Sequence, residues 1–269
     1  MQLDLPPLPL ILLGLVLALL ISGLAYAFHA LSRSGAAAAA LLGTVFFGLG
    51  GLAWAALLLA FFISSSALSR LFSRRKARFE EKFSKGHQRD AAQVFANGGI
   101  AGIFVLLHLF FPASLWPWLG CAGALAAANA DTWATELGVL DPHPPRLLTT
   151  WQPVEQGTSG AISPGGTLAA LAGSLFIALV AAIFSPVGWS AWLIGGITLA
   201  GLLGSLADSM LGATLQAIYF CPACAKETER HPLHKCGATT RRIRGLPWLN
   251  NDWVNTACTL VGALFAIII

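Results

Sequence analysis

Charged side chains are scarce in this sequence. Asp, Glu, Lys and Arg make up only 10% of its 269 residues, and just 12 residues are acidic, whereas 56% are hydrophobic and the mean hydropathy is +0.72. Soluble domains carry about 25% charged residues, so this composition excludes an ordinary soluble protein. We therefore predict an all-α, polytopic integral membrane protein with about seven transmembrane helices.

Seven apolar stretches support this prediction, and most reach the ~17 to 25 residues that a spanning helix requires. They are 8–28, 36–66, 91–111, 113–136, 163–184, 188–215 and 253–269. No Lys or Arg precedes the first stretch, which favours a retained helix over a signal peptide. The second stretch would form a helix about 46 Å long, too long for one upright span and too short for two. Gly48, Gly50 and Gly51 are candidates for a break, and the side of the N-terminus stays open.

Basic residues are confined to few places. All Lys and Arg except Arg33 lie in three loops, 67–90, 137–162 and 216–252. Even numbers of spans separate these loops, so we expect them on one side, which the positive-inside rule identifies as the cytoplasm. We interpret the run from Arg70 to Arg89 as a topology anchor attracted to anionic lipid, in preference to a specific phosphate site. The net charge of +4 then implies a membrane surface as partner and not a nucleic acid.

Three of the five cysteines lie in one loop, CPACAKETERHPLHKC, at 221–236. A reducing compartment argues against a disulfide there. Cys221 and Cys224 form a CxxC knuckle, and His231 or His234 with Cys236 would complete a tetrahedral zinc site. Four protein ligands leave no open position for substrate, so the zinc would be structural. A redox pair or a metal-free loop is the alternative.

Three acidic residues, Asp131, Glu136 and Asp208, lie within or at the edge of apolar stretches. An ionised carboxylate is costly in hydrocarbon and often marks a functional site. Helical spacing places Asn129, Thr132 and Glu136 on one stripe, with Asp131 on the neighbouring one. A second stripe, about 100° wide, contains Gly201, Ser205, Asp208, Ser209, Gly212 and Gln216. Carboxylate, hydroxyl and amide oxygens are suitable ligands for Mg²⁺, which commonly bridges to phosphate. The alternative is that these carboxylates only form hydrogen bonds between helices.

A glycine-rich stretch at 155–167 precedes the fifth span. Ser163 as N-cap and Pro164 at the first helical position would start a helix and leave backbone N–H groups free to bind an anion. No Walker lysine is present, so an ordinary capped turn is an equal alternative. The candidate phosphate cradle comprises Glu155, Gly157, Thr158, Ser159 and Gly160. Further candidates near the same membrane face are Asn97, Gly98, Gly99, Asn250, Asn251, Asp252 and Asn255.

Several long motifs carry a family resemblance. They are FANGG, ANADTWATELG, GTSGAISPGGT, GSLADSMLGATLQ, CPACAKETERHPLHKCG and RGLPWLNNDWVN. Over residues 35–269 they resemble the integral-membrane family that includes plant phytyl-phosphate kinase and vertebrate transmembrane protein 19. More distantly, Asp131-x-x-Ala134-x-x-x-Gly138 is similar to an element of dolichol kinases, phytol kinases and CDP-diacylglycerol synthases. Those relatives place a basic residue beside their Gly-Ser motif, and this chain has none there.

The resemblance implies phosphoryl transfer from CTP or another nucleoside triphosphate to an isoprenoid monophosphate. Asp131, Glu136 and Asp208 would hold Mg²⁺, with Asp252 as a further candidate, and the 157–167 loop would bind nucleotide phosphates. Residues expected to contact substrate or nucleotide also include Asn129, Thr132, Ser205, Ser209 and Gln216. The missing basic group would come from Arg146 or from Arg241, Arg242 or Arg244. Alternative functions are a prenyl-alcohol kinase, a CTP:lipid-phosphate cytidylyltransferase, or a non-enzymatic transporter.

These inferences divide the chain into five parts. We expect N-terminal transmembrane segments at 1–66, a basic cytoplasmic loop at 67–90, a catalytic transmembrane core at 91–215 that includes the cytoplasmic loop 137–162, a cytoplasmic zinc-knuckle loop at 216–252 and a last transmembrane helix at 253–269.

Overall fold

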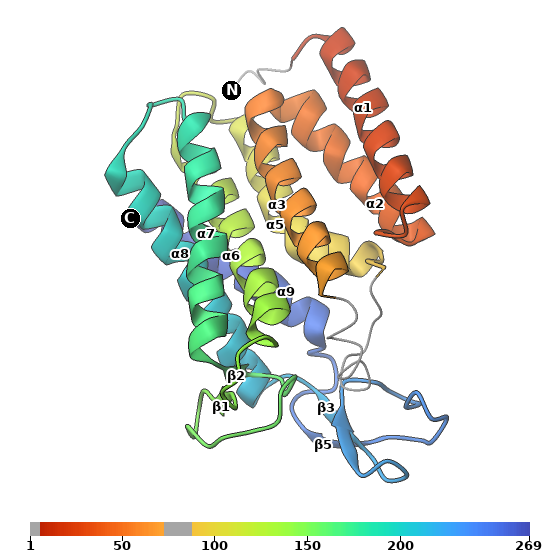
Figure 1. Ribbon diagram of the computed structural model, residues 1–269. Coiled ribbons are helices and arrows are strands. Elements are labelled where there is room, and N and C mark those ends of the chain that lie inside the picture. Colours follow the sequence, from red (N-terminus) through yellow and green to blue (C-terminus); the bar gives the residue numbers. More distant parts are fainter. Residues whose placement is uncertain (1–5, 73–87) are drawn as a thin grey trace.

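The protein is a bundle of long helices with short strands at one end (Figure 1). The computed structural model describes residues 6–72 and 88–269, so most of the predicted basic loop lies outside the described residues. Within them, eight long helical segments are present, and seven are long and apolar enough to cross a membrane. The predicted all-α, polytopic membrane fold is confirmed.

The helices follow the apolar stretches closely. Their bounds are α1 Leu8–Ala27, α2 Arg33–Thr44, the π-helical η1 Val45–Gly50, α3 Leu52–Leu71, α5 Ala91–His108, α6 Trp116–Gly138, α7 Pro164–Ile183, α8 Ala191–Thr214 and α9 Asn251–Ile268.

The 36–66 stretch forms two membrane-length segments, 33–50 and 52–71. The chain breaks at Gly51, which has a φ of +81° that other residues rarely adopt. The expectation that this stretch is too short for two spans is wrong, because the helices continue beyond it at both ends, to Arg33 and to Leu71.

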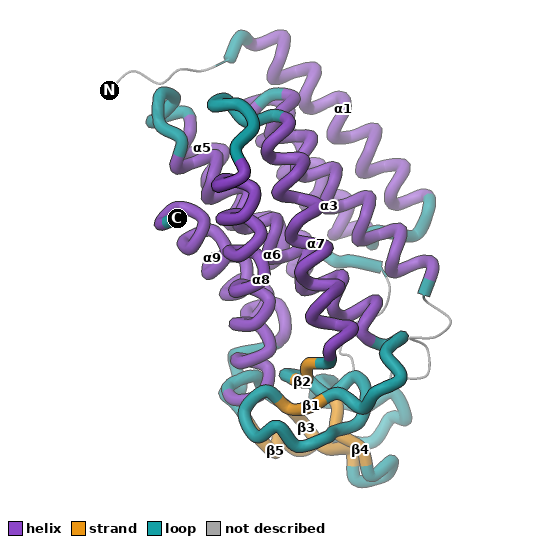
Figure 2. The backbone as a smooth tube through the Cα atoms, turned by 60° about the vertical axis from the view of Figure 1, so that its left-hand side comes forward, coloured by secondary structure: helices purple, strands orange, loops and turns teal. Residues whose placement is uncertain are grey.

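The helix α6 occupies the centre of the bundle. Figure 2 shows it among α7, α8 and α9. It packs against α3, α5, α7, α8 and α9, and most of its residues are buried. Small residues permit these close contacts: a Cβ added to Gly123 would lie 2.4 Å from the Gly262 carbonyl oxygen, and one added to Gly204 would lie 2.5 Å from Ala127 Cβ. The carboxylates predicted on α6 are therefore enclosed by helices and kept from lipid.

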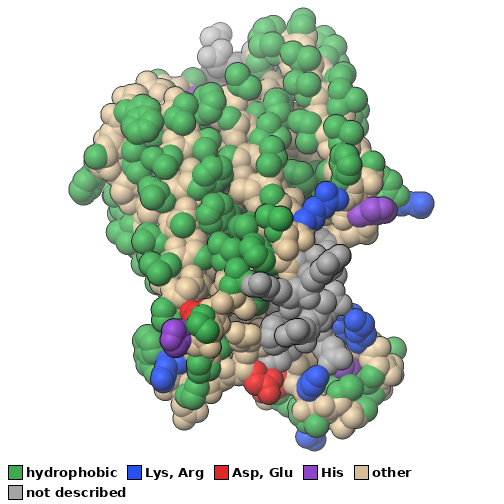
Figure 3. Space-filling model, in the orientation of Figure 1, with side chains coloured by type: hydrophobic (Ala, Val, Ile, Leu, Met, Phe, Trp, Pro, Cys, Tyr) green, Lys and Arg blue, Asp and Glu red, His purple; other side chains and the backbone are tan. Residues whose placement is uncertain are grey.

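The polar loops gather at one end of the bundle. There β1 (Arg146–Leu147) pairs antiparallel with β2 (Ala161–Ile162), and β3 (Ile218–Cys221) pairs with both β4 (Lys226–Thr228) and β5 (Arg241–Arg244). The turn before α2 lies at the same end, because Leu31 pairs with Arg89. On the face drawn in Figure 3, hydrophobic side chains cover the helices, whereas charged and His side chains gather towards the polar end.

Candidate functional site

A cavity of about 300 Å³ lies where the helices meet the polar loops. Side chains or backbone from α5 to α9, the glycine-rich loop and the β3–β5 region line it. The lining includes thirteen of the residues predicted from the sequence: Asn97, Asp131, Thr132, Glu136, Gly157, Thr158, Ser159, Gly160, Ser205, Asp208, Ser209, Asn251 and Asn255. We refer to this cavity as the polar cleft.

Carboxylates from separate elements meet in the polar cleft. Asp131 and Glu136 come from α6 and Asp208 from α8, and the Asp131 and Glu229 carboxyl groups lie within electrostatic range of Asp208. Ser69 Oγ donates a hydrogen bond of 2.8 Å to Glu136 Oε1. Asp208 Oδ2 is buried, and no hydrogen-bond donor of the described chain contacts it. A buried oxygen of this kind, beside other carboxylates and hydroxyls, fits the ligand chemistry of Mg²⁺.

Among the described residues, Arg89 is the basic residue that lines the polar cleft, and the sequence analysis assigned it to a lipid anchor. Its Nη1 donates a hydrogen bond of 3.1 Å to Ser65 Oγ, and its guanidinium carbon lies 5.5 Å from the centre of the Phe61 ring. Burial lowers the pKa of Arg89 from its usual value, whereas the Glu136 carboxylate raises it. Arg89 thus presents a cation beside the acidic residues.

The predicted basic candidates lie elsewhere. Arg146 is exposed and donates a 2.8 Å hydrogen bond to the Trp151 carbonyl, and Arg242 is exposed on β5; neither lines the polar cleft. Arg244 donates to the Ala213 and Ser159 carbonyls and so supports the glycine-rich loop from behind. The position of Arg89, directly before the N-cap of a membrane helix, is the signal that could have identified it.

The backbone of Arg89 is fixed by the turn between α1 and α2. Its N–H donates to the Ala30 carbonyl over 3.1 Å, and its carbonyl accepts from Ser32 N–H over 3.0 Å. A Cβ on Gly35 would come within 2.0 Å of the Arg89 carbonyl oxygen, so only glycine permits this approach. The N-terminal hairpin therefore positions a cleft residue.

The glycine-rich loop forms one wall of the polar cleft. Gly157 and Gly160 have φ values of +78° and +80°, and a Cβ on Gly160 would lie 2.1 Å from Ala213 N. Ser159 Oγ donates a 2.8 Å hydrogen bond to Gln216 Oε1. Within the described ranges, the backbone N–H groups of Gly157, Ser159 and Gly160 donate no hydrogen bond to the protein. Three donors are thus available to an anion.

The helix α7 starts where predicted, but backbone N–H groups that were expected to be free at its start are hydrogen-bonded within the protein. Ser163 is the N-cap and Pro164 the first helical residue. Gly166 N–H donates to Ser163 Oγ over 3.1 Å, and Gly165 N–H donates to Asp141 Oδ2 over 2.7 Å. Hydrogen bonds from the backbone N–H groups of His143 and Gly165 hold the pKa of Asp141 well below its usual range. The helix terminus is therefore already occupied by a carboxylate, and the anion site is confined to the preceding loop.

Other predicted residues have structural positions outside the lining. Asn129 is buried, donates to the Gly173 carbonyl over 2.8 Å and accepts from Ser64 Oγ over 3.0 Å, so it joins three helices. Asn250 caps α9 by accepting from Trp253 N–H. Gly98 faces Leu42 at a contact between α5 and α2, and Gly99 faces Phe95 of its own helix. The lining also omits Glu155, Gln216 and Asp252.

Glu229 is a cleft residue that the sequence analysis missed. Gln216, which is only 1% exposed, donates from Nε2 to Glu229 Oε1 over 2.9 Å. Glu229 lies inside the cysteine-rich loop, which was interpreted only as a zinc staple. Glu229 lies between the candidate metal ligands in the sequence, and this position did not predict that the loop folds back over the helices and brings Glu229 into the cleft.

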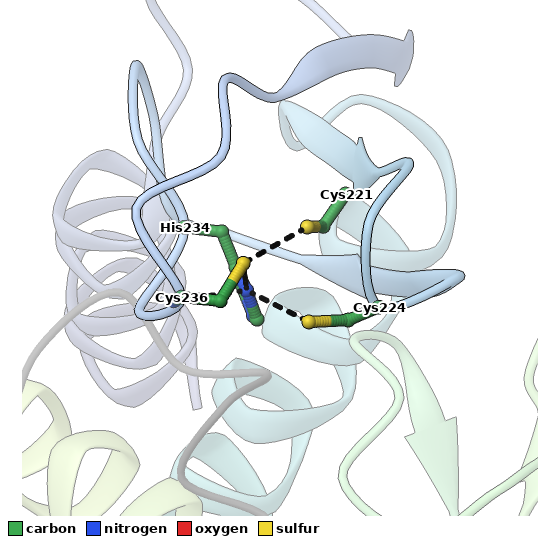
Figure 4. A group of neighbouring side chains, drawn as sticks. All are labelled: Cys221, Cys224, His234 and Cys236. Carbon is green, nitrogen blue, oxygen red and sulfur yellow. Dashed lines mark hydrogen bonds between the residues drawn. The ribbon is translucent and has the colours of Figure 1, made fainter.

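The cysteine-rich loop brings four candidate ligands together. The ligand atoms of Cys221, Cys224, His234 and Cys236 all lie within 4.8 Å of one another (Figure 4). His231 is not in this group, because its ring stacks on Tyr219 with centroids 4.4 Å apart. A hydrogen bond with His234 lowers the pKa of Cys236 to about 6. Three thiols and one imidazole could bind a metal, and this donor set fits tetrahedral zinc.

Comparison with known proteins gives consistent matches along the chain. The family profile described as "Integral membrane protein DUF92" matches residues 16–263. Protein PGR of Arabidopsis thaliana is 36% identical, over 92% of this chain and 93% of that protein. An uncharacterized membrane protein of Methanocaldococcus jannaschii is 31% identical, over 96% and 92%. Protein VTE6, chloroplastic, of Arabidopsis thaliana is 28% identical, over 88% and 65%. No solved structure matches.

Proposed function

The chain belongs to the DUF92 family of integral membrane proteins, as its motifs predicted, and from this premise we propose that it is a membrane kinase for an isoprenoid monophosphate. It transfers a phosphoryl group from CTP or another nucleoside triphosphate to a phytyl- or geranylgeranyl-type phosphate and forms the prenyl diphosphate. Members of the family to which its motifs are similar include plant phytyl-phosphate kinase.

The polar cleft is the observation that carries this proposal. In the part of the chain that the structure describes, four carboxylates, one arginine and a loop with available N–H donors meet at the end of an otherwise apolar bundle. A lipid phosphate held at this depth keeps its chain in the membrane while its headgroup reaches a nucleotide from solution. By the positive-inside rule we expect this end to face the cytoplasm, because the described parts of the three loops that carry nearly all the Lys and Arg residues lie here.

Catalysis in this cleft is mainly positioning and neutralisation of charge. The attacking phosphate oxygen is already anionic, so no strong general base is required. Arg89 orients the lipid phosphate, and the N–H groups of Gly157, Ser159 and Gly160 bind nucleotide phosphate oxygens. Asp131 and Asp208 would hold Mg²⁺, with Glu136 and Glu229 beside them; when bound, the ion neutralises charge on the phosphate oxygens.

The metal cluster has a structural role in this proposal. Cys221, Cys224, His234 and Cys236 would hold zinc, and four protein ligands leave no position for substrate. The hairpin that they close carries Glu229 into the cleft wall.

The test is product formation by purified protein. Phytyl and geranylgeranyl monophosphate are incubated with Mg²⁺ and each nucleoside triphosphate, and we expect the prenyl diphosphate together with the nucleoside diphosphate. Asp131→Asn and Asp208→Asn each lower turnover by about 100-fold or more. Glu227→Gln, an exposed residue of β4 outside the cleft, is the matched control with unchanged turnover.

The products separate this proposal from its rivals. Release of inorganic diphosphate would identify a cytidylyltransferase, and phosphorylation of free prenol would identify an alcohol kinase. If no nucleotide yields prenyl diphosphate, or if both Asn variants remain fully active, the kinase proposal is wrong.

A further inference from the structure

A second cavity, of about 70 Å³, lies among α1, α2, α3 and α5. Its lining is mostly apolar and includes Leu42, Phe47, Leu58 and Phe62. The contributing parts of α1 and α5 are those nearest the polar end, as Ala25 and Val94 illustrate. We call it the apolar cavity. It is therefore at the same depth in the bundle as the start of the polar cleft.

The two cavities share a wall. Arg89, Gln93 and Asn97 line both of them. Asn97 Nδ2 donates to the Gln93 carbonyl over 2.9 Å, and Gln93 Oε1 accepts from Asp90 N–H over 3.1 Å, so these side chains are held in place along α5. The Arg89 cation thus lies between an apolar space on one side and a polar, carboxylate-lined space on the other. That arrangement is complementary to an amphiphile whose anionic group adjoins its chain.

We propose that the apolar cavity binds the isoprenoid chain of the lipid substrate next to its phosphate, and that Arg89 at the shared wall binds that phosphate. The identity of the headgroup rests on the proposed function; the place of the chain rests on the two cavities and their common residues. This proposal defines which helices select the chain: α1, α2, α3 and α5, none of which carries the predicted acidic motifs.

The size of the apolar cavity limits what it holds. Pockets that enclose a whole ligand measure ~300 to 1,000 Å³, well above the observed volume. The cavity therefore takes the carbons nearest the phosphate, and the remaining chain extends past α1 into lipid. The helix α1 packs mainly against α2 and η1 and exposes a row of leucines, so it is the natural side for entry of a chain from the bilayer.

Filling the cavity tests this inference. Ala39 of α2 lines it, whereas Ala37 of the same helix does not, so Ala39→Phe and Ala37→Phe form a matched pair. We expect Ala39→Phe to raise KM for geranylgeranyl monophosphate by about 10-fold or more, to raise KM for dimethylallyl monophosphate as well, because its five carbons are those nearest the phosphate, and to leave KM for CTP unchanged. The Ala37→Phe protein should match wild type in all three.

A second measurement needs no turnover. A geranylgeranyl monophosphate analogue with a diazirine near the phosphate is photolysed with purified wild-type protein, and labelled peptides are mapped by mass spectrometry. We expect label on the apolar cavity lining, lost in Ala39→Phe and retained in Ala37→Phe. Label confined to lipid-facing positions, or equal kinetic effects of the two variants, would overturn the proposal. Label in the cavity with no prenyl diphosphate product would refute the kinase activity and support the lipid site. Prenyl diphosphate product without label in the cavity would support the kinase activity and refute the lipid site.

Discussion

Gln216 donates a 2.9 Å hydrogen bond to Glu229 while accepting a 2.8 Å hydrogen bond from Ser159. One buried amide therefore joins the end of α8, the glycine-rich loop and the cysteine-rich hairpin. Because both of its neighbours line the polar cleft, the geometry of the cleft depends on the hairpin that the metal ligands close.

Metal analysis tests the role of that hairpin. We expect about one zinc per purified chain, lost in Cys224→Ser and His234→Ala and retained in His231→Ala, because, of the histidines that the structure describes, only His234 is within reach of the three thiols. Loss of zinc should also lower the thermal midpoint by roughly 5 °C and reduce turnover, since Glu229 is no longer held. Elemental analysis and thermal unfolding provide the readouts. Stoichiometric zinc in His234→Ala would contradict this assignment.

The proposed role of Arg89 can be compared directly with that of the basic residues predicted from sequence. Arg89→Gln should lower turnover about 100-fold, because it removes the charge that faces the carboxylates and the lipid phosphate. Arg146→Gln and Arg242→Gln should remain within about 2-fold of wild type, since neither side chain lines the cleft. Steady-state kinetics on the three variants measures these effects. A large loss of turnover in Arg146→Gln or Arg242→Gln would favour the sequence-based prediction that one of these residues supplies the basic group.

The conformation of the glycine-rich loop predicts a steric effect. Gly160→Ala would place a methyl group 2.1 Å from Ala213 N at a φ of +80°, so we expect destabilisation of about 1 to 3 kcal/mol and a displaced loop. Gly195→Ala on α8 is the control, because a Cβ added there would have nothing within 4 Å. Denaturation curves and the KM for nucleotide should separate the two. Equal behaviour of both variants would mean that the loop is not held against α8.

Asp141 predicts a dependence of stability on pH. Its folded-state pKa is held below the unfolded value of about 3.9, so its contribution is complete above that value and is lost as pH falls through the folded pKa. Wild type should therefore lose stability on acidification below about pH 4, and Asp141→Asn should be less stable at neutral pH but lose less in acid. Thermal midpoints between about pH 3 and pH 7 measure this. If the thermal midpoints of wild type and Asp141→Asn fall in parallel as pH is lowered, Asp141 does not cause the acid dependence of stability.

Local sequence patterns predicted the parts of the site that depend on one helix. The stripe on α8 places Gly201 against Ser174 and Ala126 and directs Asp208 into the cleft, as helical periodicity requires. Contacts between distant segments were not predictable in the same way. Asp141 captures the Gly165 N–H from 24 residues away, and Arg89 reaches the cleft only because the α1–α2 turn holds its backbone.

The central position of α6 has a consequence for how the protein is made. This helix carries Asn129, Asp131 and Glu136, and it is not among the seven helices that meet the criteria of length and apolarity for a span. A translocon would partition such a segment into lipid poorly on its own. Its neighbours α7, α8 and α9 are synthesised later, so the polar stripe of α6 is shielded from lipid only after these helices have been inserted. Biogenesis of the bundle is thus coupled to the candidate site: the segment that carries Asp131 and Glu136 is also the one whose insertion depends on the rest of the chain.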